Sequence, residues 1–429
     1  MAAPKLRFKE FNDNWLKVDI QSLVDEKIID KPMDGNHGEI HPTSADYVED
    51  GIPFVMATDV IDGKVYLDKS KKIKKSQADG LRKGFSLEGD ILLTHKATIG
   101  NVAKVPELKT PYIMLTPQVT YYRVLNKDKL NKDFIKSTFE APVFQNALLA
   151  LCTGATRLYI GISEQRKLPF SYPSKKEQTK IASFLSAVDE KISQLMQKHE
   201  LLNQYKQGMM QKLFSQEIRF KADDGREFGE WEEKTLIDSV DTNIKWSFTG
   251  GPFGSNLKSE DYTELGIRII QLQNIGDGAF LNDYKIYTSP EKANELLSCN
   301  IYPDEILISK MGDPVARCCI VPKHHDRYVM CSDGIRLVVD KQNYSSIFMF
   351  YQINYQDFRQ SASDVSTGST RKRIGLSDLK QLPIKVPCLE EQTKIANFLS
   401  AIDQKIEVVA QQIEQAKQWK KGLLQQMFV

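Results

Sequence analysis

The histidines and cysteines are the first residues to consider, because imidazole and thiolate groups at set spacings bind zinc. The chain has six of each. They are His37, His41, His95, His199, His324 and His325, and Cys152, Cys299, Cys318, Cys319, Cys331 and Cys388. Neither set shows zinc-ligand spacing or a C-x-x-C pair. We predict no metal site and interpret the cysteines as reduced thiols of a cytoplasmic protein.

Motifs for cofactor chemistry are missing as well. The nearest relative of a G-x-x-x-x-G-K-[ST] phosphate loop, GGPFGSNLK at 250–258, lacks the lysine–hydroxyl ending and is typical of a turn-rich loop. Asp313-Pro314-Val315 is no match for the N-P-P-[YF] element with which adenine methyltransferases hold a flipped base. The carboxylates form no recognisable nuclease cluster. We therefore predict no catalytic residue and no cofactor bound by this chain.

Basic residues suggest a different chemistry, contact with nucleic acid. The net charge of +2 neither demands nor excludes DNA, so a basic patch has to be local. The densest run is DKSKKIKKSQ at 68–77, with Lys69, Lys71, Lys72, Lys74 and Lys75. Clustered lysines are suited to phosphate contact, although a solvated charged hairpin explains the same run equally well.

A second basic cluster is STRKRIG at 369–375, which contains Arg371, Lys372 and Arg373. The first half of the chain has Arg157 in the related TGATR. An arginine on a glycine–threonine loop is suited to phosphate or base-edge contact. Further DNA-contact candidates are Arg82, Lys83, Lys96 and Lys310, the last aligned with His95. Lys258, Arg268 and Arg317 are weaker candidates.

The sequence segments that position these residues occur twice in the chain. Residues 173–192 and 387–406 share fourteen of twenty positions, and TGATRLYIGIS at 153–163 answers TGSTRKRIGLS at 367–377. Phe8 and Trp15 are likewise answered by Phe220 and Trp231. The shared order indicates a duplicated unit. We predict a first globular domain at 1–172, a helical region at 173–215, a second domain at 216–386 and a second helical region at 387–429.

The globular domains are predicted to be mixed and β-rich. Short apolar runs such as IPFVMATDV, GDILLTH, QVTYYRVL, RIIQLQNI, EILISK and IRLVVD are separated by turn residues. Helix-like pieces follow at 132–151 and 346–362. The expected class is α+β, with two such domains and two long helices. The N-terminus lacks an apolar h-region and no apolar run is long enough to cross a bilayer, so we expect a cytoplasmic protein.

The helical regions each carry one apolar stripe at spacings of three and four. The residues chosen for helix pairing and partner docking are Ile181, Phe184, Leu185, Ile192, Leu202, Ile395, Phe398, Leu399, Ile406 and Ile413. Lys206 and Lys420 stand where the stripe needs an apolar residue, which can determine register at a cost in stability. Ser186 with Asp189 could cap a fresh helix, so one long helix or two shorter ones remain open for each region.

A stripe of this kind needs a partner, and the obvious one is its own copy. If a pseudo-two-fold axis relates the halves, the helices form an antiparallel intramolecular coiled coil. Helices of about 25–38 residues would be about 37–57 Å long, the length of about 11–17 base pairs of B-DNA. The simpler alternative is that the coiled coil only holds two duplicated domains together.

The twice-written P-x-x-x-E-Q-x-K-I-A-x-F-L-S-x-x-D-x-K-I resembles the helical regions of the specificity subunit of Type I restriction–modification systems. The resemblance covers essentially the whole chain. It implies that each domain, a target-recognition domain, reads half of a bipartite, asymmetric site in double-stranded DNA. It also implies that the helices set the spacer and dock two modification subunits. Those subunits would supply S-adenosylmethionine, and restriction subunits would add ATP and Mg²⁺.

Two other function classes stay open at this stage. A self-contained methyltransferase or nuclease would need chemistry that the motifs above do not provide. A non-catalytic scaffold would gather proteins through its helices without reading DNA. Sequence-selective binding to duplex DNA would distinguish the DNA-reading subunit from the scaffold. Methylation by the purified chain alone would indicate the enzyme.

Overall fold

A computed structural model describes residues 3–38, 41–154, 158–252, 254–368 and 371–429. The chain divides into two compact units, one made of residues 1–197 with 409–429 and the other of residues 198–408. Each unit therefore combines one globular segment with parts of both helical regions. Within the described ranges, no helix has both the length and the apolar character that crossing a bilayer requires.

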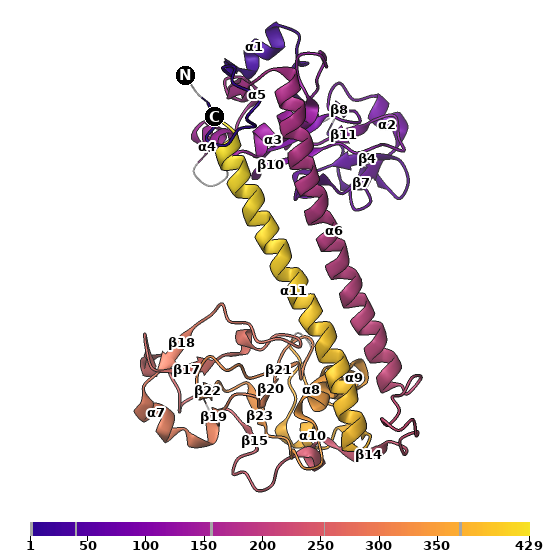
Figure 1. Ribbon diagram of the computed structural model, residues 1–429, viewed down its shortest axis with the longest axis vertical. Coiled ribbons are helices and arrows are strands. Elements are labelled where there is room, and N and C mark those ends of the chain that lie inside the picture. The colour runs from indigo at the N-terminus through magenta and orange to yellow at the C-terminus, as the bar shows by residue number, and fades with distance from the viewer. Residues whose placement is uncertain (1–2, 39–40, 155–157, 253, 369–370) are drawn as a thin grey trace. The chain divides into compact units, whose positions relative to one another are not determined.

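The first unit is built on two main sheets (Figure 1). The four-stranded sheet has the order β10 (Thr98–Lys104), β9 (Ile91–Lys96), β12 (Val119–Tyr122) and β2 (Met33–Asp34). The five-stranded sheet has the order β3 (Tyr47–Val48), β7 (Lys71–Ile73), β4 (Ile52–Val55), β11 (Ile113–Leu115) and β8 (Phe85–Ser86). Two ribbons pair β1 (Leu16–Asp19) with β13 (Pro169–Tyr172) and β5 (Val60–Ile61) with β6 (Lys64–Val65). The parallel β11–β4 pair makes the five-stranded sheet mixed.

The second unit repeats this plan, except that its described residues contain no ribbon equivalent to β5–β6. Its four-stranded sheet has the order β21 (Cys318–Ile320), β20 (Ile306–Ser309), β23 (Gly334–Leu337) and β15 (Phe248–Gly250). Its five-stranded sheet has the order β16 (Tyr262–Thr263), β18 (Ile286–Thr288), β17 (Ile267–Ile270), β22 (Tyr328–Met330) and β19 (Asn300–Ile301). β14 (Glu232–Thr235) pairs with β24 (Pro383–Val386), and the parallel pair is β17 with β22. The predicted duplication is thus a duplication of fold.

The α-helices occupy equivalent places in the two units, except that a 3-10 helix at Leu236–Ser239 takes the place of the first one. The first unit has α1 (Ile20–Asp25), α2 (Lys75–Asp79), α3 (Lys132–Glu140), α4 (Pro142–Ala150) and α5 (Ile162–Gln165). The second has α7 (Pro290–Glu295), α8 (Ser346–Asn354), α9 (Gln356–Asp364) and α10 (Leu376–Lys380). The helix-like pieces at 132–151 and 346–362 are each two helices. The breaks fall at Ala141 and Tyr355, whose extended backbones separate the helices.

The two helical regions are continuous helices. α6 (Lys175–Phe214) has 40 residues and α11 (Leu389–Met427) has 39. The alternative of a short helix followed by a second one capped at Ser186 and Asp189 is therefore wrong. Asp189 instead forms ion pairs with Lys136 and Lys420, so its carboxylate serves tertiary structure rather than a helix start.

Much of each apolar stripe is buried in the core of a globular segment. Ile181 and Leu185 belong to the core of the first unit, and Phe184 and Ile192 pack against it. Ile395 and Leu399 belong to the core of the second unit, with Phe398 and Ile406 packed against it. The remaining pairing candidates, Leu202 and Ile413, lie on the helices outside those core clusters; Leu202 is half-buried and Ile413 is buried. The apolar stripe therefore packs each helix against the core of a globular segment as well as against the other helix.

Contacts between the helices follow an antiparallel order. In the first unit, Phe184 of α6 meets Trp419 of α11 with ring centroids 6.0 Å apart. In the second unit, Lys206 Nζ of α6 lies 2.6 Å from Asp403 Oδ1 of α11. Early α6 thus contacts late α11 in one unit, and late α6 contacts early α11 in the other.

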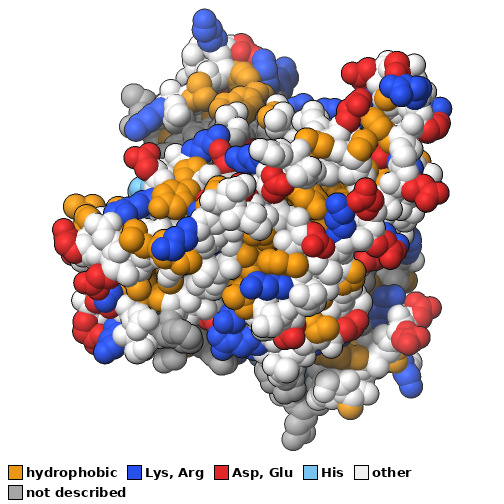
Figure 2. Space-filling model, turned by 90° about the horizontal axis from the view of Figure 1, so that it is seen from below, with side chains coloured by type: hydrophobic (Ala, Val, Ile, Leu, Met, Phe, Trp, Pro, Cys, Tyr) orange, Lys and Arg blue, Asp and Glu red, His pale blue; other side chains and the backbone are white. Residues whose placement is uncertain are grey.

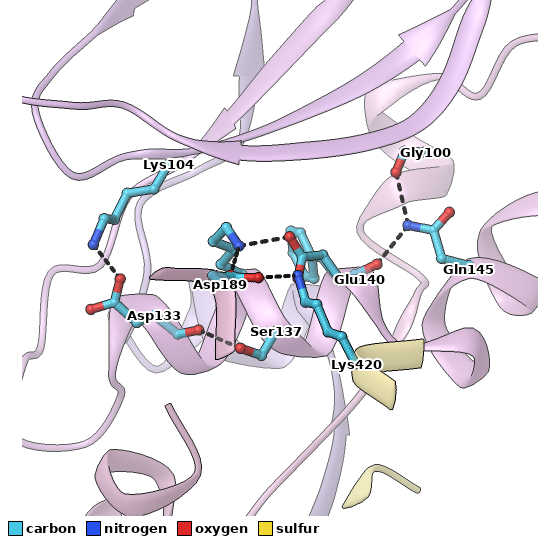
Figure 3. A network of polar contacts seen from close by, with 10 residues as sticks. Gly100, Lys104, Asp133, Ser137, Glu140, Gln145, Asp189 and Lys420 are labelled. Atoms are coloured by element: carbon cyan, nitrogen blue, oxygen red, sulfur yellow. Dashed lines mark hydrogen bonds and ion pairs between the residues drawn. The ribbon is translucent and has the colours of Figure 1, made fainter. Parts of the chain in front are cut away.

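The lysines that interrupt the stripe have carboxylate partners. Lys420 Nζ lies 2.7 Å from both Asp189 Oδ1 and Glu140 Oε2 (Figure 3). Lys136 Nζ bridges the same two carboxylates at 2.9 and 2.7 Å. In the second unit, Lys206 pairs with Asp403 and also lies over the Tyr351 ring. Each of the two lysines therefore pairs with an aspartate of the other long helix.

Candidate nucleic-acid interface

Each unit pairs the two ends of the glycine–threonine segment that precedes its long helix. In the second unit, the backbone amides of Thr367 and Arg373 donate to each other's carbonyl oxygens at 2.9 and 2.8 Å. In the first unit, Thr153 and Tyr159 do the same, both at 2.9 Å. Gly368 and Gly154 have positive φ values of 98° and 103°, a conformation that favours glycine. We call these segments, 153–159 and 367–373, the pinned loops.

Each pinned loop is attached to the end of a central strand. The Ile160 amide donates to the His95 carbonyl oxygen at 3.1 Å, and the Ile374 amide donates to that of Lys310 at 3.0 Å. His95 lies on β9, and Lys310 directly follows β20. All residues of these two strands except Lys96 are buried. The aligned positions His95 and Lys310 are thus structural equivalents, because each anchors its loop through the same backbone contact.

The second pinned loop brings several predicted DNA-contact residues together. Arg371 and Arg373 are exposed, and Arg373 Nη2 donates to Asp333 Oδ1 at 2.9 Å. Lys372 turns back toward α9, where its Nζ contacts the Ser363 hydroxyl and carbonyl oxygens. Lys310 adjoins them because its amide donates to the Asp333 carbonyl oxygen at 2.7 Å. This loop therefore presents two arginines and keeps its lysine half-buried.

The remaining candidates are placed differently. Lys96 is exposed and its backbone pairs with Tyr159, so it lies at the first pinned loop. Arg157 falls outside the described residues. Lys258 is exposed before a short 3-10 turn, with its amide bonded to Asp261.

The lysine run at 68–77 belongs to another part of the first unit. Lys71 and Lys72 lie on β7 of the five-stranded sheet, between β3 and β4. Lys75 starts α2 and pairs with Asp79 at 2.6 Å, and Lys69 lies over the Tyr66 ring. Lys74 is exposed just before α2. The run is consequently separate from the loop-bearing four-stranded sheet.

A polar cluster lies beside the first pinned loop, and sequence reasoning named only its Lys83. Asp34, at the end of β2, is buried, and its carboxylate accepts from Lys83 Nζ and from His37 Nε2, the latter at 2.9 Å. His95 Nε2 lies 4.0 Å from the same carboxylate, and its Nδ1 lies 2.9 Å from the Ile160 carbonyl oxygen. The repeat could not indicate Asp34, because β15 has Gly250 at the equivalent place.

The pKa values in this cluster follow from burial and pairing. Burial lowers the pKa of His95, and the hydrogen bond to the Ile160 carbonyl and the charge of Asp34 only partly oppose it. Burial would raise the pKa of the Asp34 carboxyl, but hydrogen bonds from Lys83 and His37 outweigh it and hold the pKa below its usual range. A neutral His95 donates from Nδ1 to Ile160 and leaves Nε2 as an acceptor.

The lowered pKa of His95 predicts an acid-sensitive first unit. Since the unfolded chain binds this proton more readily, stability is fully present above about pH 6.5 and lost as pH falls below it. The groups facing His95 are Asp34, His37 and Lys96, and the Asp34 charge moderates the effect. His95→Gln should flatten the dependence of melting temperature on pH between about 8 and 5.5. Exposed His324→Gln is the control, and equal slopes in wild type and His95→Gln would contradict the prediction.

Charge elsewhere on the surface is mixed. Figure 2 shows Lys and Arg side chains interspersed with Asp and Glu on the face that it draws. A field of one sign does not cover that face, which agrees with the net charge of +2. Electrostatic attraction for DNA would then have to come from local groups such as those at the pinned loops.

Comparison with known proteins identifies the family. A family model described as Type I restriction modification DNA specificity domain matches residues 34–204 and 273–418. The chain belongs to this family. The resemblance inferred from the twice-written helical motif is confirmed, and so is the α+β class with two β-rich domains and long helices.

Family relatives share most of the chain. A candidate MjaX specificity subunit of a type I restriction enzyme from Methanocaldococcus jannaschii is 26% identical over 383 residues, which cover 87% of this chain and 85% of that protein. The type I restriction enzyme MjaVIII specificity subunit of the same organism is 27% identical over 314 residues, covering 69% and 66%. The family match therefore includes both halves of the duplication.

Solved structures show the same fold. The crystal structure of a Type-I restriction-modification system S subunit from M. genitalium matches with a TM-score of 0.57 and 18% identity, covering 100% of this chain and 99% of the other. A chain from a study of complex assembly and conformational transition of the type I R-M system matches with a TM-score of 0.55 and 16% identity, covering 97% and 98%. Because the sequence identities are low, these matches show a shared fold and no more.

Proposed function

We propose that this chain is the DNA-reading, non-catalytic subunit of a Type I restriction–modification complex, in which each unit reads one half of a bipartite, asymmetric site. The observation that carries the proposal is the repeated frame of pinned loop and central strand. The frame is the same in both units, but it presents Tyr159 in one and Arg373 with the partly exposed Lys310 in the other. Different side chains on one frame would read different base pairs.

The partners of the chain follow from the same proposal. Two modification subunits would dock on the helical regions and bring S-adenosylmethionine for adenine methylation, and restriction subunits would bring ATP and Mg²⁺. The complex would work on duplex DNA in the cytoplasm. The catalytic residues would then belong to those other chains. Methylation by this purified chain with S-adenosylmethionine alone would contradict the proposal.

The direct test is to express the chain with its modification subunit and map the methylated adenines across a genome. A bipartite motif with two different halves and an unspecified spacer is the expected result. Binding of the assembled complex to duplexes carrying that motif should exceed binding to scrambled duplexes. Equal binding to both would favour the non-catalytic scaffold.

The helices would act as the ruler for the spacer. A rise of about 1.5 Å per residue makes α6 and α11 each about 60 Å long, the length of about 17 base pairs. Inserting seven residues after Gln197 in α6 and after Gln411 in α11 keeps the stripe in phase and adds about 10 Å. The spacer of the methylated motif should grow by about three base pairs, and both half-sites should stay unaltered.

A matched control places two extra residues after Asp224, in the exposed turn that the Lys221–Glu227 backbone pair closes. That insertion leaves both helices intact and should not change the motif. Circular dichroism checks that the helical insertion increases helix content. An unchanged spacer in a folded, lengthened variant would refute the ruler.

A further inference from the structure

We propose that in each unit one carboxylate holds a cation beside the pinned loop, and that these anchored cations determine which bases each unit accepts. In the first unit, Asp34 would hold Lys83 and His37. In the second unit, Asp333 would hold Arg373. The ligand is the acceptor-bearing edge of base pairs in duplex DNA, guanine above all. The inference rests on the proposed function and assigns residues to it.

In the first unit, this arrangement consists of a buried carboxylate and two more exposed nitrogen-bearing side chains. The side chain of Asp34 is 7% exposed, whereas those of Lys83 and His37 are 33% and 56% exposed. Asn36 joins the two segments, since its Nδ2 donates to the Lys83 carbonyl oxygen at 2.5 Å and its Oδ1 accepts from the Arg82 amide at 3.0 Å. The acid is therefore inside, and the Lys83 ammonium and the His37 ring that it orients reach the solvent.

Glycines allow the two segments to approach this closely. A Cβ on Gly35 would lie 1.8 Å from the Leu115 carbonyl oxygen, and a Cβ on Gly84 would lie 2.9 Å from the Gly35 Cα atom. Neither position can hold a larger residue without moving the backbone. The backbone thus brings Asp34 and Lys83, the residues next to these glycines, to one place.

Two unpartnered polar atoms face the same place. His95 Nε2 is buried, points toward Asp34 at 4.0 Å, and has no hydrogen-bond partner within the part of the chain that the structure describes. Thr120, directly opposite Asp34 on β12, has a buried hydroxyl that also lacks a partner there. Buried polar groups are normally satisfied, so these two atoms indicate a site that receives another polar group.

The second unit forms the corresponding carboxylate–cation pair from residues at other positions of the repeat. Gly250 stands where the first unit has Asp34, and Lys310 stands where it has His95. The acid comes instead from Asp333, whose side chain is 20% exposed, and it holds Arg373, whose side chain is 49% exposed, at 2.9 Å. Both units therefore place a carboxylate-held cation at the base of the pinned loop, but from different positions of the repeat.

Anchoring has a physical consequence for base reading. A lysine or arginine held on a carboxylate has lost most of its rotational freedom, so binding to a base costs less entropy. The carboxylate also cancels part of the charge, which reduces attraction to any phosphate regardless of sequence. An arginine in this state still offers free N–H groups to guanine O6 and N7, and the Lys83 ammonium offers its remaining donors. Such groups therefore contribute more to discrimination between base pairs than to the overall affinity for duplex DNA.

The test replaces each acid by its neutral isostere, Asp34→Asn and Asp333→Asn, in the complex with modification subunits. Binding is measured on duplexes in which each base pair of both half-sites is changed in turn. Asp34→Asn should lower discrimination about tenfold or more at positions of one half-site only, and Asp333→Asn at positions of the other half-site only. Affinity for scrambled duplex should stay equal or rise, because a negative charge has been removed.

Controls separate a reading role from a merely structural one. Glu26→Gln and Asp304→Asn remove exposed acids that pair with Lys129 and Lys323, and both should leave discrimination unchanged. Lys83→Met and Arg373→Met keep the aliphatic stems and should reproduce the half-site effects even if an Asp→Asn variant fails to fold. Unchanged discrimination, or an equal loss at both half-sites, would overturn the inference. A wild-type complex without any sequence preference would instead refute the proposed function itself.

Discussion

Replacing Arg219 by alanine is expected to destabilise the second unit by about 3–5 kcal/mol, the cost of leaving a buried charge without its partner. Arg219 donates from Nε to Glu391 Oε1 at 3.1 Å and from Nη2 to Oε2 at 2.6 Å, and the side chain of Glu391 is 0% exposed. The guanidinium also donates to the Gly229 carbonyl oxygen at 2.6 Å. It therefore ties the segment before β14 to the first turn of α11.

The same pair occurs in the first unit. Arg7 donates to both oxygens of Glu177 at 2.7 Å, and Glu177 lies in the first turn of α6 with a buried side chain. Hydrogen bonds to these carboxylates raise the pKa of both arginines. Arg7→Ala should therefore have an effect of similar size on the first unit.

Hydrogen exchange followed by mass spectrometry, combined with urea unfolding, measures these effects unit by unit. Arg219→Ala should speed exchange in β14 and β24 and shift the unfolding of the second unit to lower urea. Arg226→Ala is the control, because Arg226 is exposed and its pair with Asp224 should contribute little. The double variant Arg219→Met with Glu391→Gln should recover much of the loss. Wild-type stability in Arg219→Ala would contradict the argument.

Replacing Lys420 by methionine should destabilise the first unit by about 3 kcal/mol, toward the lower end of the cost of breaking a buried pair. Lys420 and Lys136 alternate with Asp189 and Glu140, so that two cations face two anions (Figure 3). Burial alone would raise the pKa of Asp189, but both lysines outweigh it and lower the pKa. Without Lys420, a single lysine would have to balance two carboxylates in a largely buried place.

Comparison of three lysines tests this interpretation. Lys417→Met on the same helix removes only an exposed pair with Glu414 and should change stability little. Lys206→Met in the second unit removes one carboxylate partner and the contact with the Tyr351 ring, so its effect should fall between the other two. Thermal melting of the three variants gives the order. A Lys420→Met protein as stable as Lys417→Met would mean that desolvation of the network cancels its attraction.

Much of the fold could be predicted because its signals are local. Alternating or continuous apolar runs predicted β4, β9, β12, β17, β20 and β23, and the apolar stripe predicted α6 and α11. The duplication could be read from identical letters at a constant offset. The breaks at Ala141 and Tyr355 were less evident, because the helices on either side continue one helix-like sequence.

The sequence by itself determined the two repeated halves, the two long helices and the presence of an arginine-bearing loop before each helix. Only the tertiary structure decided what Lys206, Lys420 and Asp189 contact, because their partners come from distant segments. It also decided that Asp34 and Lys83 meet beside His95, at a place where the second unit uses Asp333 and Arg373. Periodicity describes neighbours along one element, whereas a site of this kind depends on which elements pack together.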